Sequence, residues 1–131
     1  MKNILLEPAN GETFQVSEKP KYVEVRPRLR EELEGAFASD DENEICNAMY
    51  SAAQYEQDWR WAQGELIKFL SHESLLVRST AINALGELVL FRGHVDLEVV
   101  LPEIHKLQND PALAPFVQEY LEDLKSRVTI H

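Results

Sequence analysis

The chain has 131 residues, of which 44% are hydrophobic, and its formal net charge is −10. That length and composition indicate one domain with a sizeable core and argue against global disorder. No apolar run approaches the roughly 18 residues of a membrane span, the first apolar run is too short for a signal peptide, and a single cysteine leaves no internal disulfide. We therefore expect a cytoplasmic protein.

Residues 1–26 differ in character from the rest of the sequence. They hold β-leaning fragments separated by Pro8, Asn10-Gly11 and Pro20. Asn-Gly between such fragments is a signal for a β-hairpin, but an extended arm lying on the first helices fits equally well. The sequence thus predicts an irregular or hairpin segment at 1–26, followed by a helical domain at 27–131.

Three helices are predicted in the first part of that domain, at 28–38, 41–54 and 58–70. In each of them apolar residues recur at intervals of three or four, which places these residues on one face of a helix. Asp58 or Gln57 precedes the third helix as a candidate N-cap.

The helix predicted at 74–91 has the clearest pattern. Ser74 is its candidate N-cap, and Gly93 is placed to end it because glycine readily adopts the left-handed conformation. Gly86 lies inside the helix, where glycine costs about 1 kcal/mol relative to alanine, so we expect a close helix crossing there. The apolar stripe consists of Val77, Ala81, Ala84, Leu85 and Leu88.

Two further helices are predicted at 97–108 and 112–126. Pro102 falls inside the first, and an interior proline removes a hydrogen bond and clashes with the preceding turn. We expect a kink there, or a short turn at 97–100 followed by a helix that begins near Pro102. Asp110 and Pro111 suit the start of the last helix, as cap and first-turn residue.

The stripe of 74–91 recurs at a spacing of 36 residues. It maps forward onto Leu113, Val117, Leu121 and Leu124, and backward onto Ile45, Met49 and Ala52. Small and large residues alternate along it, in an order that resembles the second helix of a HEAT-type repeat. One such helix pair cannot bury its apolar face alone. The predicted fold is therefore all-α, with about three antiparallel HEAT-like pairs in a right-handed solenoid.

Almost all of the negative charge lies in residues 31–58. This stretch contains nine Asp or Glu and no Lys, Arg or His, whereas residues 1–30 have a net charge of +2 and residues 59–131 of −3. Such a field repels nucleic acid and anionic lipid and attracts a basic protein. Alternatively, the acids serve only solubility or, at 40–42, favour a helix N-terminus.

No catalytic or metal-binding set is recognisable in the sequence. The four histidines lack metal-ligand spacing, and the motifs of serine hydrolases and phosphate-binding loops are missing. The run Asp40-Asp41-Glu42-Asn43-Glu44 lacks the glycine and ligand spacing of an EF-hand loop. Cys46 is expected to be a small, half-buried apolar residue. We therefore expect a protein that is not an enzyme and uses no cofactor or metal.

Two tyrosines and two tryptophans, Tyr50, Tyr55, Trp59 and Trp61, fall within twelve residues in and beside the acidic stretch, and Tyr and Trp supply large, rigid contact areas. Trp59 fits the core stripe of 58–70, whereas Trp61, two residues on, must face another way. Trp61 therefore either packs between helices or contacts a partner. The predicted partner-binding residues are Asp40, Asp41, Glu42, Glu44, Tyr50, Tyr55, Asp58 and Trp61.

Several short motifs extend the likeness to known proteins. They are Asp-Asp-Glu-Asn-Glu-Ile-Cys at 40–46, Asp-Trp-Arg-Trp at 58–61, Val-Arg at 77–78, Ala-Leu-Gly at 84–86 and Asp-Leu-Glu-x-Val-Leu-Pro at 96–102. Residues 40–126 thereby resemble small HEAT-like bacterial proteins, among them immunity proteins of contact-dependent growth-inhibition and other polymorphic toxin systems. The third unit departs from the pattern at Ala114, where Arg78 would recur. No binding residue is carried over, because the interfaces of these proteins vary.

This resemblance implies a protein that binds and neutralises a cognate toxin, and many such toxins are basic nucleases. Our first hypothesis is therefore an immunity protein that contacts a cationic toxin through its acidic surface, without binding nucleic acid or membrane. The alternative is a non-enzymatic HEAT-like scaffold or assembly factor of a cellular complex. A nucleic-acid glycosylase would need a basic concave face, the reverse of what this chain offers.

Overall fold

The computed structural model describes residues 24–127, and within them the fold is all-helical, without strands. The six α-helices are α1 (Arg30–Phe37), α2 (Glu42–Tyr55), α3 (Trp59–Lys68), α4 (Leu75–Glu87), α5 (Leu97–His105) and α6 (Ala114–Arg127). A 3₁₀ turn, η3 (Phe69–Ser71), extends α3, and a π-helical turn, η4 (Leu88–Arg92), extends α4. The all-α class is therefore confirmed. The hairpin or arm expected at 1–26 lies almost entirely outside the described residues.

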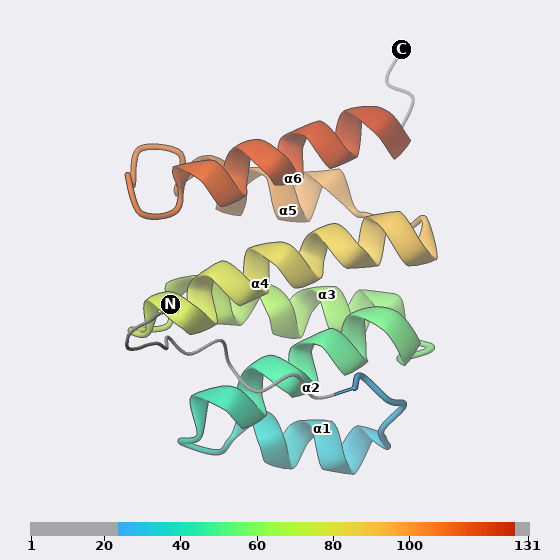
Figure 1. The fold of residues 1–131 in the computed structure, drawn as a ribbon. Coiled ribbons are helices and arrows are strands. Elements are labelled where there is room, and N and C mark those ends of the chain that lie inside the picture. The colour runs from blue at the N-terminus through green and yellow to red at the C-terminus, as the bar shows by residue number, and fades with distance from the viewer. Residues whose placement is uncertain (1–23, 128–131) are drawn as a thin grey trace, which may run out of the picture.

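The helices are stacked in two layers (Figure 1). In one layer α2, α4 and α6 run in the same direction, while α3 and α5 lie behind them and α1 closes the lower end against α2. The central helix α4 contacts α2, α3 and α6. A HEAT-like, right-handed solenoid remains our interpretation of this stacking. None of the helices in 24–127 is long and apolar enough to cross a membrane.

The 36-residue spacing in the sequence identifies the inward-facing side chains. Val77, Ala81, Leu85 and Leu88 are all buried. Their counterparts Leu113, Val117, Leu124, Ile45, Met49 and Ala52 are buried as well, and Leu121 is partly buried. The stripe inferred from periodicity is thus the core of the molecule.

Side chains cap three of the described helices, and two of these caps, Asp58 and Ser74, were predicted from the sequence. Asp41 accepts hydrogen bonds from the backbone N–H groups of Asn43 and Glu44, Asp58 from that of Trp61, and Ser74 from that of Val77. Gly93 ends η4 in the left-handed conformation, with φ of 71°, as predicted. These local signals therefore account for three helix starts and one helix end.

Two helix boundaries differ from the prediction. α5 begins at Leu97, as predicted, but ends at His105 rather than at 108, and it contains Pro102, so the alternative of a separate turn at 97–100 is wrong. The N–H that proline lacks would have bonded to Glu98, whose exposed position in the first turn leaves its carbonyl open to water. α6 begins at Ala114 rather than 112, because Asp110 accepts a hydrogen bond from the N–H of Ala112 and holds a turn before the helix.

Gly86 lies at a close helix crossing, as predicted. A methyl group in place of its hydrogen would lie 3.4 Å from Asp123 Oδ2 and 3.7 Å from Tyr120 Cδ1, both on α6. These are ordinary van der Waals distances, so the crossing is close but leaves room for an alanine.

Candidate functional site

The predicted partner-binding residues fall into separate groups along α2. Asp40, Asp41, Glu42 and Glu44, which we call the acidic corner, lie at the N-terminal end of α2. Tyr55, Asp58 and Trp61 lie at or beyond its C-terminal end. Because α2 has 14 residues, these two ends are about 20 Å apart. Tyr50 lies between them, half-buried, so the structure does not gather the predicted residues at one point.

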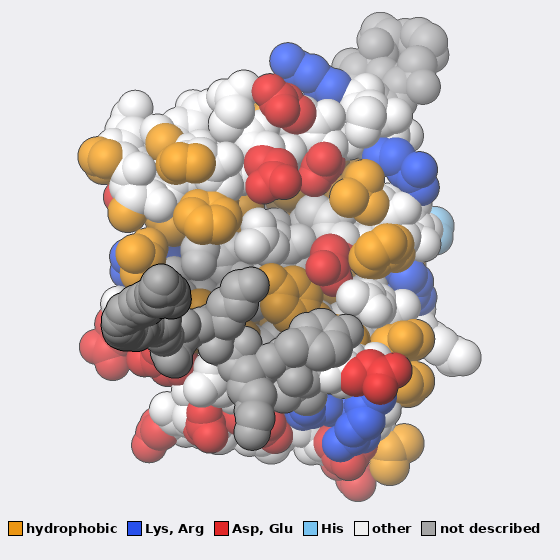
Figure 2. All heavy atoms as spheres, viewed as in Figure 1, with side chains coloured by type: hydrophobic (Ala, Val, Ile, Leu, Met, Phe, Trp, Pro, Cys, Tyr) orange, Lys and Arg blue, Asp and Glu red, His pale blue; other side chains and the backbone are white. Residues whose placement is uncertain are grey.

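The acidic corner combines exposed charge with local structural contacts. Asp41 caps α2, Glu42 Oε1 accepts a hydrogen bond of 2.9 Å from the Ser74 hydroxyl, and Glu44 lies 3.5 Å from the Arg28 guanidinium. All four carboxylates nevertheless remain exposed. Figure 2 shows acidic side chains gathered over the lower end of the molecule, around α1 and the start of α2.

At the other end of α2, Arg30 organises the predicted residues. Its guanidinium nitrogen Nη2 lies 2.9 Å from Glu56 Oε2 and 3.9 Å from Asp58 Oδ2, and the group sits 3.9 Å above the centre of the Trp61 ring. Burial would raise the pKa of Glu56, but hydrogen bonds from Arg30 and from the Asp58 N–H lower it overall. Two arginines that precede the acidic stretch in the sequence, Arg28 and Arg30, thus form ion pairs with carboxylates inside it.

The two tryptophans have different surroundings. Trp59 packs against the core, as predicted, and its ring stacks on His94 at a centroid distance of 4.9 Å. Trp61 packs beside Phe37 against the small apolar cluster of α1, α2 and α3. Trp61 therefore has a packing role, whether or not it also contacts a partner.

Tyr55, at the C-terminal end of α2, is 45% exposed and so is accessible to a partner.

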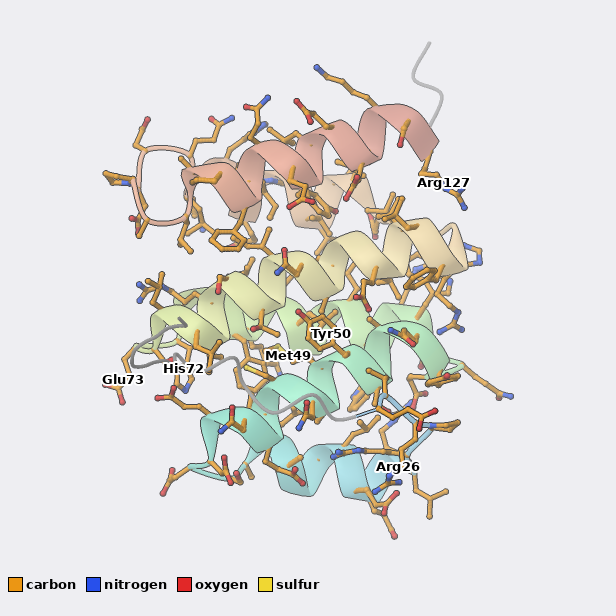
Figure 3. All side chains as sticks on the ribbon, in the orientation of Figure 1. Arg26, Met49, Tyr50, His72, Glu73 and Arg127 are labelled. Carbon is orange, nitrogen blue, oxygen red and sulfur yellow. The ribbon has the colours of Figure 1, made fainter. Side chains whose placement is uncertain are left out.

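A groove between α4 and α6, which we call the α4–α6 groove, brings together residues that the sequence analysis mostly missed. Its volume is about 330 Å³. The lining residues are Tyr50, Ile82, Asn83, Gly86, Glu87, Leu90, Phe91, Phe116, Glu119, Tyr120 and Asp123. Tyr50, the only predicted contact residue among them, comes from α2 and lies between α2 and α4 in Figure 3.

Three carboxylates line this groove, and none of them forms an ion pair with a Lys or Arg of residues 24–127. They belong to Glu87 on α4 and to Glu119 and Asp123 on α6. Glu87 accepts a hydrogen bond of 2.9 Å from the Gln54 amide. Burial raises the pKa of Glu87, and the Gln54 hydrogen bond only partly opposes this. The groove therefore holds negative charge without a cation.

Tyr120 lines the same groove with a hydroxyl that has no hydrogen-bond partner in the described part of the chain. The residue is only 2% exposed, and leaving a buried hydroxyl unpaired costs about 1–3 kcal/mol. Burial, with the nearby charge of Asp123 as a second cause, raises the pKa of this phenol. The hydroxyl therefore stays protonated and also offers an unused acceptor oxygen.

A signal for this groove is present in the sequence. Glu87 is the only charged residue between Arg78 and Arg92, and it directly follows Gly86. A lone carboxylate beside a helix crossing indicates a site between two helices rather than a solvated face. The aromatic side of the groove, on α6, has no comparable signal.

Metal and thiol chemistry find little support in the described residues. Within 24–127, no three His, Cys, Asp or Glu side chains are grouped as metal ligands. Cys46 is buried rather than half-buried as predicted, and burial raises the pKa of its thiol.

Comparison with known proteins shows a likeness to a solved structure. No protein-family model and no curated protein match the sequence. The structure is similar to a chain in the crystal structure of a CDI complex from Cupriavidus taiwanensis LMG 19424, with a TM-score of 0.73 and 26% sequence identity. The match covers 85% of this chain and 100% of that one. The resemblance to contact-dependent growth-inhibition (CDI) proteins, first seen in short motifs, is thus confirmed across the fold.

Proposed function

We propose that this protein is an immunity protein, which binds a toxin of a CDI system and neutralises it. The observation that carries the proposal is the likeness to a chain of a CDI complex over the full length of that chain, at 26% identity. Binding of the native toxin by such a protein lowers the free toxin by mass action, without chemistry. On this proposal the protein acts in the cytoplasm and is not an enzyme.

The charge of the chain supports a cationic toxin. The net charge is −10, and the stretch 31–58 has nine acidic residues. An acidic protein attracts a basic one and increases the rate of association more than the final affinity. A nuclease suits this description best, because it holds its anionic substrate with Lys and Arg. The carboxylates of the immunity protein would then occupy those groups.

Two surfaces are the candidate contacts in this proposal. The acidic corner offers four exposed carboxylates, and the α4–α6 groove offers two partly buried ones, Glu87 and Asp123, and the exposed Glu119, beside Tyr50 and other aromatic rings. Tyr55, Asp58 and Trp61 also remain candidate contacts, although Asp58 caps α3 and Trp61 packs under Arg30.

The test is to isolate the C-terminal domain encoded by the gene immediately upstream and mix it with this protein. We expect a one-to-one complex by size-exclusion chromatography and light scattering, and loss of the domain's toxic activity at equimolar ratio. A toxin domain from an unrelated system is the control and should neither bind nor be inhibited. A neighbouring gene without a toxic domain, or a toxic domain that does not bind, would favour a scaffold function instead.

A further inference from the structure

The α4–α6 groove has the properties of a site for a guanidinium group. We propose that it receives an arginine side chain of the partner protein. The identity of the partner rests on the immunity function proposed above, but the chemistry of the groove does not. At about 330 Å³, the groove is at the small end of the range of ligand pockets, which suits a single side chain.

Charge is the first argument for a cation. Glu87, Glu119 and Asp123 reach the groove from two helices, and none has an ion-pair partner among residues 24–127. Glu87 is half-buried, and its pKa is raised by that burial. Arg127 Nη2 donates to the carbonyl oxygen of the groove residue Leu90, at 2.7 Å, and forms no ion pair with these carboxylates. A further cation would therefore meet three available acceptors.

The hydroxyl of Tyr120 is a second, independent argument. It is polar, more than nine-tenths buried and unpaired in the described structure, and the residue lines the groove beside Asp123. Buried polar groups in proteins nearly always have a hydrogen-bond partner. The hydroxyl oxygen itself is shielded from solvent, so a guanidinium, which carries five N–H donors in a planar fork, would bond to it and to a carboxylate together only by displacing the side chains that cover it.

Aromatic rings favour arginine over lysine. Tyr50, Phe91 and Phe116 line the groove together with Tyr120, and Phe91 is 63% exposed. A guanidinium stacks on such rings, whereas an ammonium is more strongly hydrated and only approaches them as a point charge. On the face seen in Figure 2, acidic and hydrophobic side chains lie side by side over α4 and α6. This combination is the one a buried arginine needs.

The molecule already holds one of its own arginines in this way. Arg30 sits 3.9 Å above the Trp61 ring while it contacts Glu56 and Asp58. The α4–α6 groove repeats the same elements, carboxylates beside aromatic rings, but no Lys or Arg of residues 24–127 is paired with its carboxylates.

The first experiment needs no toxin. The ¹H–¹⁵N NMR spectrum of the full chain is titrated with the peptide acetyl-Gly-Arg-Gly-amide and, separately, with its citrulline counterpart, which has the same shape and no charge. We expect saturable shifts for residues of α4 and α6 around the groove, with a Kd in the millimolar range, and none with citrulline. Equal effects of the two peptides, or shifts confined to the acidic corner, would overturn the proposal.

Two double variants sharpen this test because they remove the same amount of charge. Glu87→Gln with Asp123→Asn should weaken arginine binding at least tenfold, while Asp40→Asn with Glu44→Gln, in the acidic corner, should leave it within twofold. Both are checked for intact folding by circular dichroism. The groove is not the site if the two variants lose binding equally.

The same variants are then measured against the cognate toxin. We expect the groove variant to lose tenfold or more in affinity, as is typical when one side of a desolvated charge pair is removed. A groove variant that binds the toxin as tightly as the wild type would show that the partner does not use the groove. Failure of the wild-type protein to bind any toxin would instead overturn the immunity function, while the peptide result would still decide the chemistry of the groove.

Discussion

Glu87 shows how one residue can favour binding at the expense of stability. Its carboxylate is half-buried on α4 and faces Tyr50 and Gln54 of α2 and the acids Glu119 and Asp123 of α6. Burial raises its pKa above the ordinary value of about 4.3. The folded state therefore loses stability as pH rises through the folded-state pKa, because Glu87 must then carry its charge in a partly desolvated place.

Glu87→Gln should remove this loss. The free energies of unfolding of variant and wild type should be close below pH 4, and the variant should become more stable by a few tenths of a kcal/mol toward pH 7. Urea unfolding at a series of pH values measures the difference. Glu122→Gln removes the same charge from an exposed position of α6 and controls for net charge. A difference that does not grow with pH would contradict the assignment.

The residues of the groove show what a sequence cannot display directly. Periodicity identified the buried stripe of Val77, Ala81 and Leu88, because burial of a stripe is a property of one helix. Glu87 and Tyr120 become neighbours only when α4 packs on α6, and this packing depends on two segments more than thirty residues apart. Gly86 marked the crossing, but it did not show which side chains would surround it.

Among the elements, α2 depends on a single carboxylate for its start. Asp41 Oδ1 accepts the N–H of Asn43 at 3.0 Å and that of Glu44 at 3.3 Å. Asp41→Ala should therefore lower the free energy of unfolding by about 1 kcal/mol. Asp40→Ala, one residue earlier, removes an equal charge but no cap, and should change stability by less than about 0.5 kcal/mol. Urea denaturation separates the two, and equal losses would mean that charge, not capping, matters at this corner.

The six helices were predictable because caps and stripes are local. The predicted 41–54 and 58–70 agree with α2 and with α3 plus η3 to within about two residues. The structure differs from the prediction in α5 and at the start of α6, where contacts other than caps and apolar stripes decide. α5 tolerates Pro102 because the missing backbone hydrogen bond would have been to residue 98, in the exposed first turn. α6 starts at Ala114 because the Asp110 side chain accepts the N–H of Ala112 and stabilises a turn before the helix. The counter-charges of the acidic stretch escaped prediction because Arg28 and Arg30 lie just before it and reach it only in three dimensions.

At the scale of the whole molecule, the two acidic surfaces should act at different stages of binding. The acidic corner is exposed, so its field extends into solvent and is screened by salt over about 10 Å at 0.1 M ionic strength. In the groove, Glu87 and Asp123 are partly buried whereas Glu119 is exposed, so the first two act most strongly once a partner side chain has entered and displaced water. Long-range charge governs the association rate constant, kon, whereas desolvated contacts govern the dissociation rate constant, koff.

Kinetics of the toxin complex should therefore distinguish the two surfaces. Asp40→Asn with Glu44→Gln should lower kon several-fold at low salt, leave koff nearly unchanged, and match the wild type near 1 M salt, where screening is complete within about 3 Å. Glu87→Gln with Asp123→Asn should raise koff at every salt concentration and change kon little. Stopped-flow association and surface-plasmon dissociation measure the two constants. If both variants altered only kon, and salt abolished both effects, the groove would be part of the general acidic field and not a site that an arginine enters.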